Sequence, residues 1–211
     1  MNIIRRPFRY SYDNAVFVLI GLNVLVYLAI QLFRDIPLIA YLSMNPVLVM
    51  HRGWVWQFFT YMFVHDPHSI THILFNMFAL FIFGRQVEQQ MGTREFLLYY
   101  FMTGMLAGVF SFFVYLLSGN HWVFLMGASG AMFGVQLAFA VYFPRSIIYI
   151  WGILPLRAPV MVLGFSVLSV VFMVTGTGGN VAHITHLAGF AFGWLYFIVR
   201  FGINPLRAMR Y

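Results

Sequence analysis

The sequence predicts an all-α membrane protein, a bundle of six transmembrane helices in a single domain covering residues 1–211. Two observations carry this prediction. Of the 211 residues 62% are hydrophobic and only 8% are charged, with a mean hydropathy of +0.85, and the apolar residues fall into long runs. A helix needs about 20 apolar residues to cross the roughly 30 Å hydrocarbon layer of a bilayer. A multi-pass membrane protein is therefore expected.

Six apolar runs approach that length. In chain order they cover residues 15–33, 70–87, 95–117, 127–144, 158–175 and 181–199. The segment 34–69 is different, because it contains three prolines, several charges and two tryptophans. Proline interrupts helices and tryptophan favours the membrane interface. The segment is therefore predicted to be a long interfacial loop between helices one and two.

The arginines indicate how the chain is oriented. With six spans and the N-terminus inside, only Arg34 and Arg52 fall on the outer side. The inner side then holds Arg5, Arg6, Arg9, Arg85, Arg94, Arg145, Arg157, Arg200, Arg207 and Arg210. Such an excess marks the cytoplasmic side. We expect a multi-pass protein of the cell inner membrane with both termini cytoplasmic. The net charge of +7 then reflects topology and attraction to membrane lipid, not nucleic-acid binding.

Three polar side chains are predicted to share one layer just below the outer surface. Helices two, four and six all enter from outside, and His72, Ser129 and His186 lie within about the first six residues of their spans. At 1.5 Å per residue they reach depths of up to about 9 Å. Polar groups inside a span are costly, so they are candidates for function.

Glycines spaced by four residues indicate that helices four and six meet. Gly130 and Gly134 follow Ser129, and Gly189 and Gly193 follow His186. Small residues at this interval let membrane helices approach closely. The contact would bring the Ser129 hydroxyl within reach of the His186 imidazole, which is the arrangement of an activated nucleophile and its base.

Donors for a developing oxyanion are found beside this pair. Asn76 follows His72 by four residues, so both side chains lie on one helical face. The backbone N–H of Ser129, at a helix start, is a third donor, and Gly127 lets the preceding loop come close. Acyl transfer requires donors at this position, so a hydrolase site that opens to the outer, periplasmic side is predicted.

A catalytic carboxylate is not expected. Of the five acidic residues only Asp66 lies near the right depth, and it is in the loop. We therefore predict a Ser–His dyad, with Phe133, one turn below Ser129, as an aromatic platform for the imidazole.

Four motifs resemble those of the rhomboid family of intramembrane serine proteases. HILFN resembles the family's HxxxN, GRQVEQQMG its GxxxExxxG, GASG its GxSG, and HLAGFAFG its HxxGxxxG. The resemblance implies that Ser129 is the nucleophile, that His186 is the base and then the acid, and that His72, Asn76 and the Ser129 backbone form the oxyanion hole. It implies transmembrane protein substrates and no cofactor. Glu88 is expected to be a structural hydrogen-bonding residue.

The sequence departs from the family pattern at two positions. Trp56-Gln57 stands where many members have Trp-Arg, which concerns how the first loop is held. Phe133 stands where some members have tyrosine, which keeps a stacking surface without the hydroxyl.

Other interpretations of the same residues stay open at this point. Ser129 could be a small packing residue, and the chain a non-catalytic binder of transmembrane helices. His183 and His186 could line the cavity of a channel or transporter. His65, His68 and His72 have irregular spacing for zinc, so no metal is expected. His65 and His68 are most simply interfacial loop residues.

Overall fold

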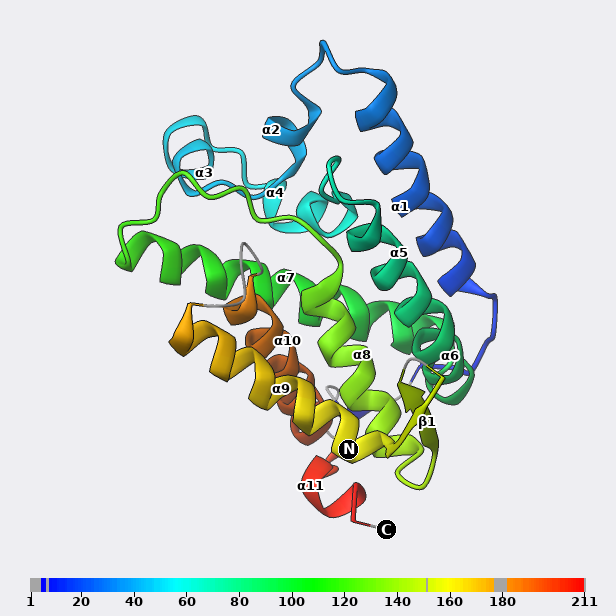
Figure 1. Cartoon of the computed structure of the whole chain (residues 1–211). Helices are drawn as coiled ribbons and strands as arrows, with labels where there is room; N and C mark the ends of the chain where they lie inside the picture. The colour runs from blue at the N-terminus through cyan, green and yellow to red at the C-terminus, as the bar shows by residue number, and fades with distance from the viewer. Residues whose placement is uncertain (1–4, 7, 151, 177–181, 211) are drawn as a thin grey trace.

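The computed structural model describes residues 5–6, 8–150, 152–176 and 182–210, and it is a helical bundle (Figure 1). Among these residues, five helical segments are long and apolar enough to cross a membrane. They are Ala15–Leu32 (α1), Ile70–Met91 (α5, η3 and α6), Thr93–Leu117 (α7), Ala158–Thr175 (α9) and His183–Phe201 (α10 and η4). The all-α membrane class is confirmed. The predicted run 181–199 begins at a residue outside the described ones.

Two of these segments contain a π-helical stretch. The second joins α5 (Ile70–Ala79), η3 (Leu80–Gly84) and α6 (Arg85–Met91). The last joins α10 (His183–Tyr196) to η4 (Phe197–Phe201), and the short α11 (Pro205–Ala208) follows.

The fourth apolar run forms a helix that is too short to cross a bilayer alone. This helix, α8 (Ser129–Tyr142), has 14 residues where the run 127–144 has 18. Its length is therefore about 21 Å, against a hydrocarbon layer of roughly 30 Å. It lies in the middle of the bundle against α7, α9 and α10 (Figure 1). Its tertiary position, and not contact with lipid, accounts for its apolar composition, since most of its residues are buried.

The predicted interfacial loop, residues 34–69, contains several short helices. These are α2 (Leu38–Leu42), α3 (Pro46–Arg52), α4 (Gln57–Thr60) and η2 (Tyr61–Phe63). The buried Gln57 holds them together, because its amide donates to the carbonyl of Ala40 at 2.7 Å and accepts from the N–H of Asn45 at 3.1 Å. The glutamine that departs from the family pattern therefore pins the loop by neutral hydrogen bonds.

The connection between α8 and α9 forms a β-hairpin that the sequence did not predict. Strand β1 (Ile147–Ile150) pairs antiparallel with β2 (Leu154–Arg157). The residues of β1 are alternately exposed and partly buried, which is the two-residue period of a strand. Because both faces are apolar, the hydrophobic pattern in the sequence shows no such period.

Glu88 joins the start of α1 to the end of α6. Its carboxylate accepts the backbone N–H groups of Ala15 at 2.7 Å and Val16 at 3.0 Å, and the hydroxyl of Thr93 at 2.6 Å. The first N–H groups of a helix have no partner within the helix and carry its positive dipole end, so a buried carboxylate satisfies them well.

We expect Glu88→Gln to lower the free energy of unfolding by about 2 kcal/mol, because the amide NH₂ would face a buried N–H that then has no acceptor. The measurement is an equilibrium unfolding titration in mixed micelles. Gln90→Ala, an exposed change in the same helix, is the matched control and should stay within about 0.5 kcal/mol of the parent. A Glu88→Gln protein as stable as the control would contradict this role.

Candidate active site

Ser129 and His186 meet across two helices. Ser129 is the first residue of α8, and His186 lies in the first turn of α10. The Nε2 atom of His186 is 2.8 Å from the Oγ atom of Ser129, within hydrogen-bonding distance. Both side chains are only partly buried. The structure therefore places a hydroxyl against an imidazole at a site that keeps some exposure.

Glycines make this meeting possible. A Cβ atom built on Gly189 would overlap the carbonyl oxygen of Gly130 and lie 2.7 Å from its carbonyl carbon. One turn further along, a Cβ on Gly193 would lie 3.1 Å from the Cα of Gly134. The backbones of α8 and α10 are thus in direct contact at both levels. Any side chain at Gly189 would separate the helices and with them the Ser129–His186 pair.

The ring of Phe133 lies flat against the imidazole of His186. Their centroids are 4.5 Å apart and their planes differ by 11°. Phe133 follows Ser129 by one helical turn, so one helix supplies both the hydroxyl and the surface that orients its partner. Stacking of this kind restricts the rotation of the imidazole without a hydrogen bond.

His72 faces the same space from α5. A Cβ atom on Gly127 would lie 2.9 Å from Nε2 of His72 and 3.7 Å from Oγ of Ser129, and Gly127 has a φ of +117° that favours glycine. The glycine therefore leaves free a small volume between the two side chains. Asn76 is buried one turn along α5, where its amide donates to the backbone carbonyl of His72 at 2.8 Å.

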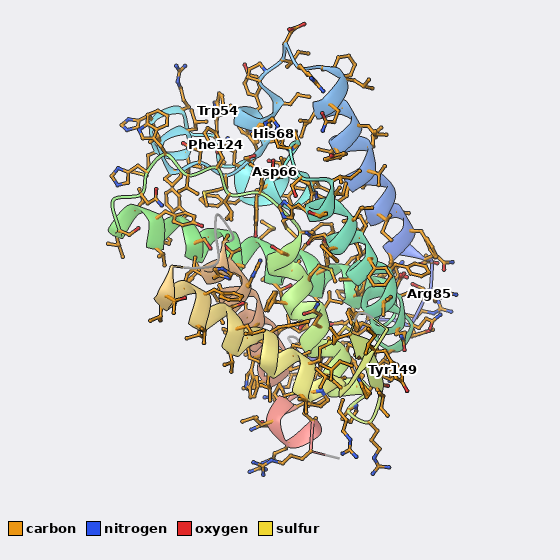
Figure 2. The ribbon with its side chains drawn as sticks, viewed as in Figure 1. Trp54, Asp66, His68, Arg85, Phe124 and Tyr149 are labelled. Carbon is orange, nitrogen blue, oxygen red and sulfur yellow. The ribbon has the colours of Figure 1, made fainter. Side chains whose placement is uncertain are left out.

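His65 is a core residue and not an interfacial one. It is fully buried, and its ring meets the ring of His72 edge-on with centroids 5.1 Å apart. Burial, together with a smaller effect of the neighbouring His72, lowers the pKa of His65 to about 3, so the imidazole is neutral at physiological pH. The expectation of an interfacial loop residue is wrong because the loop folds back over α5. No spacing in the sequence distinguishes His65 from its exposed neighbour His68 (Figure 2).

The other histidines do not form a metal site. No three His, Cys, Asp or Glu side chains in the described part of the chain are arranged to hold a metal ion. His183, at the start of α10, packs edge-on to His186 with centroids 6.0 Å apart and against Phe172 of α9 at 5.6 Å. It therefore lies between α9 and the Ser129–His186 pair.

Three carboxylates near the bundle have other partners. Glu88 binds the start of α1, as described above. Glu95 forms a two-point ion pair with Arg200, at 2.7 Å for each contact. Asp66 accepts the backbone N–H of His68 at 2.9 Å (Figure 2). The orientation of His186 therefore rests on packing, chiefly on Phe133.

A polar contact that the sequence did not reveal fixes α10 at the level of the site. The hydroxyl groups of Thr185 and Ser111 lie 2.7 Å apart between α10 and α7, and both residues are buried. Thr185 immediately precedes His186. The pair resists sliding of α10 past α7, because a shift in either direction would break this buried hydrogen bond in an apolar environment. The Ser111 hydroxyl also bonds to the carbonyl of Ala107 on its own helix at 2.8 Å.

Comparison with known proteins supports the same family as these residues. The Rhomboid domain model matches residues 52–203, which include every residue of the candidate site. "RHOMBOID-like protein 1" of Arabidopsis thaliana is 28% identical over 164 residues, which are 77% of this chain and 39% of the relative. "Rhomboid protease GlpG" of Haemophilus influenzae is 35% identical over 118 residues, 56% of this chain and 58% of the relative. The match thus covers less than two thirds of each relative. The chain belongs to the rhomboid family.

Proposed function

We propose that the protein is an intramembrane serine endopeptidase that cleaves transmembrane or membrane-adjacent segments of other membrane proteins. The observation that carries this proposal is the 2.8 Å contact between Oγ of Ser129 and Nε2 of His186 inside a membrane bundle. A protein that only binds helices, or a channel, gains nothing from a hydroxyl held against an imidazole. Acyl transfer requires that arrangement.

The reaction follows from the two side chains. As Oγ of Ser129 attacks the peptide carbonyl, Nε2 of His186 takes the hydroxyl proton and a tetrahedral oxyanion forms. His186 then gives this proton to the amide nitrogen, the C–N bond breaks, and an acyl-serine remains. Water attacks the ester by the same route, with His186 again as base and then acid. The stacked Phe133 keeps the ring aligned through both steps.

The oxyanion would be bound by donors from α5 and α8. The backbone N–H of Asp66 lies 3.4 Å from Nδ1 of His72. A neutral His72 that accepts there carries its own proton on Nε2, the nitrogen beside Gly127 and Ser129. The Ser129 backbone N–H, at the start of α8, is the second donor. Asn76 orients His72 through its backbone and supplies a further N–H from the same helical face.

The substrate must be unwound locally before it can be cut. A transmembrane helix satisfies its backbone groups internally, so its carbonyl carbons are protected from attack. Residues that weaken a helix are therefore preferred at the cleavage site. The excess of arginines on the inner side of the predicted topology favours an orientation with both termini cytoplasmic and the site opening to the periplasmic side of the inner membrane. Water reaches Ser129 from that side.

We expect His72→Ala to reduce kcat by about 10²–10³-fold, the effect of removing one side-chain donor from an oxyanion site. Asn76→Ala should lower kcat as well. Both variants should keep KM within a few-fold of the parent, because these donors act on the transition state. Cleavage of a reconstituted fluorescent transmembrane substrate measures both constants. Leu74→Ala, an exposed change on the outward face of α5, is the matched control. An unchanged kcat in both variants would contradict the assignment of His72 and Asn76 as donors to the oxyanion.

A fluorophosphonate probe tests the proposed function directly. Such probes react with activated serines, so the intact protein should become labelled on Ser129. His186→Ala, which leaves the hydroxyl in place, should lose most of the labelling. An unlabelled, folded parent protein would favour the non-catalytic binder of transmembrane helices.

A further inference from the structure

The hairpin β1–β2 carries an apolar face that the rest of the described chain does not cover. Ile148, Ile150 and Leu156 turn inward and pack against the core of the bundle. The outward side chains are also large and apolar, and 54–83% of each is exposed. These side chains are Ile147, Tyr149, Ile153 and Leu154. A hairpin with one face in water normally alternates apolar and polar residues. The composition of this hairpin indicates an apolar environment on its outer side.

The position of the hairpin agrees with contact to lipid. It runs alongside the bundle, and Tyr149 lies on the same side of the molecule as Arg85 of α6 (Figures 1 and 2). Since α6 is the end of the span Ile70–Met91, the hairpin lies near the level at which that span ends. It is also continuous with α8 and α9, because the N–H of Ala158 donates to the carbonyl of Ser146 at 2.9 Å and closes its base.

The base of the hairpin is basic and hollowed. Arg145 lies just before β1, and Arg157 is the last residue of β2 and pairs in register with Ile147. Both arginines are exposed. The surface there forms a shallow, wide-open depression, lined by Tyr142, Phe143, Pro144, Arg145 and Ser146. The chemistry of the base therefore suits a phosphate.

We propose that this hairpin is a binding site for anionic phospholipid, with its outward face among the acyl chains and with Arg145 and Arg157 on the headgroup phosphate. Interfacial segments bury their apolar face about 5–10 Å into the boundary between headgroups and acyl chains. At that depth water still reaches the open strand edges, whose N–H groups could not be left unsatisfied in the hydrocarbon core. The assignment of the site to the inner leaflet rests on the proposed orientation of the chain. The proposed contact of the hairpin with lipid does not depend on that orientation.

The depth of the hairpin can be measured on one residue. The chain contains no cysteine, so Ile153→Cys accepts a single nitrobenzoxadiazole label in proteoliposomes. Because Ile153 is 83% exposed, the change leaves the core intact. We expect blue-shifted emission, strong quenching by lipids brominated on the acyl chain and little quenching by iodide in the buffer. Asp35→Cys, at the exposed turn after α1, is the matched control and should show the reverse.

The headgroup preference is measured with the same label. Each arginine near an anionic surface favours binding by about fivefold. At equal mole fraction, brominated phosphatidylglycerol should therefore quench the label at 153 at least about fivefold more effectively than brominated phosphatidylcholine. The double variant Arg145→Gln, Arg157→Gln should bring this ratio close to one while the emission stays blue-shifted.

Two results would overturn the proposal. In the first, the label at 153 behaves like the label at 35, which places the hairpin in water. In the second, emission is blue-shifted but depends on protein density and not on brominated lipid, which assigns the face to a second copy of the chain. Neither readout uses proteolysis, so failure here is distinct from failure of the proposed enzymatic function.

Discussion

We expect cleavage of a reconstituted transmembrane substrate to fall by about 10⁴-fold or more when Ser129 is replaced by alanine, which is the scale expected when a catalytic nucleophile is removed. The change deletes one oxygen atom and leaves the packing of α8 against α10 unaltered, since that packing depends on Gly130 and Gly189. The loss should therefore appear in kcat, with KM and the unfolding free energy close to those of the parent. Product formation in proteoliposomes measures it.

Ser166→Ala is the matched control for this prediction. Ser166 lies in the spanning helix α9, and among the described residues its hydroxyl bonds only to the carbonyl of Val162 on the same helix, at 2.9 Å. Its removal should leave the rate within a few-fold of the parent. Cleavage that survives Ser129→Ala would refute the serine mechanism, and cleavage that chelators abolish would instead favour a metal-dependent reaction.

Gly189→Ala should destabilise the protein by about 3 kcal/mol, at the upper end of the usual cost of overpacking a core. The added methyl group would overlap the backbone of Gly130, and no flexible side chain is available to move aside. The helices α8 and α10 must separate, and with them Ser129 and His186. We expect a lower unfolding free energy in mixed micelles, together with the loss of most of the activity.

Gly164→Ala is the matched control, because Gly164 lies within the spanning helix α9 and a Cβ there would meet nothing within 4 Å. Alanine is the better helix former by up to about 1 kcal/mol, so this variant should be as stable as the parent or slightly more stable. If Gly189→Ala and Gly164→Ala unfold alike, the close contact of α8 and α10 does not exist in the membrane.

The candidate site could be inferred in advance because its clues are local. One short stretch contains Ser129, Gly130 and Gly134, and another contains His186, Gly189 and Gly193. Each stretch therefore shows both the polar residue and the glycine face by which its helix packs closely against another. Gln57 and Thr185 are different. Each is an ordinary polar residue in the sequence, and only its partner, the carbonyl of Ala40 or the hydroxyl of Ser111, shows what it does.

The membrane class and the pairing of the two glycine motifs follow from composition and spacing, because the thickness of a bilayer and the pitch of a helix set the length and period of the pattern. The shortness of α8, the burial of His65 and the hairpin between α8 and α9 do not follow from them. The sequence does not distinguish a residue surrounded by lipid from one surrounded by protein. The positions of these segments are therefore determined by long-range packing alone.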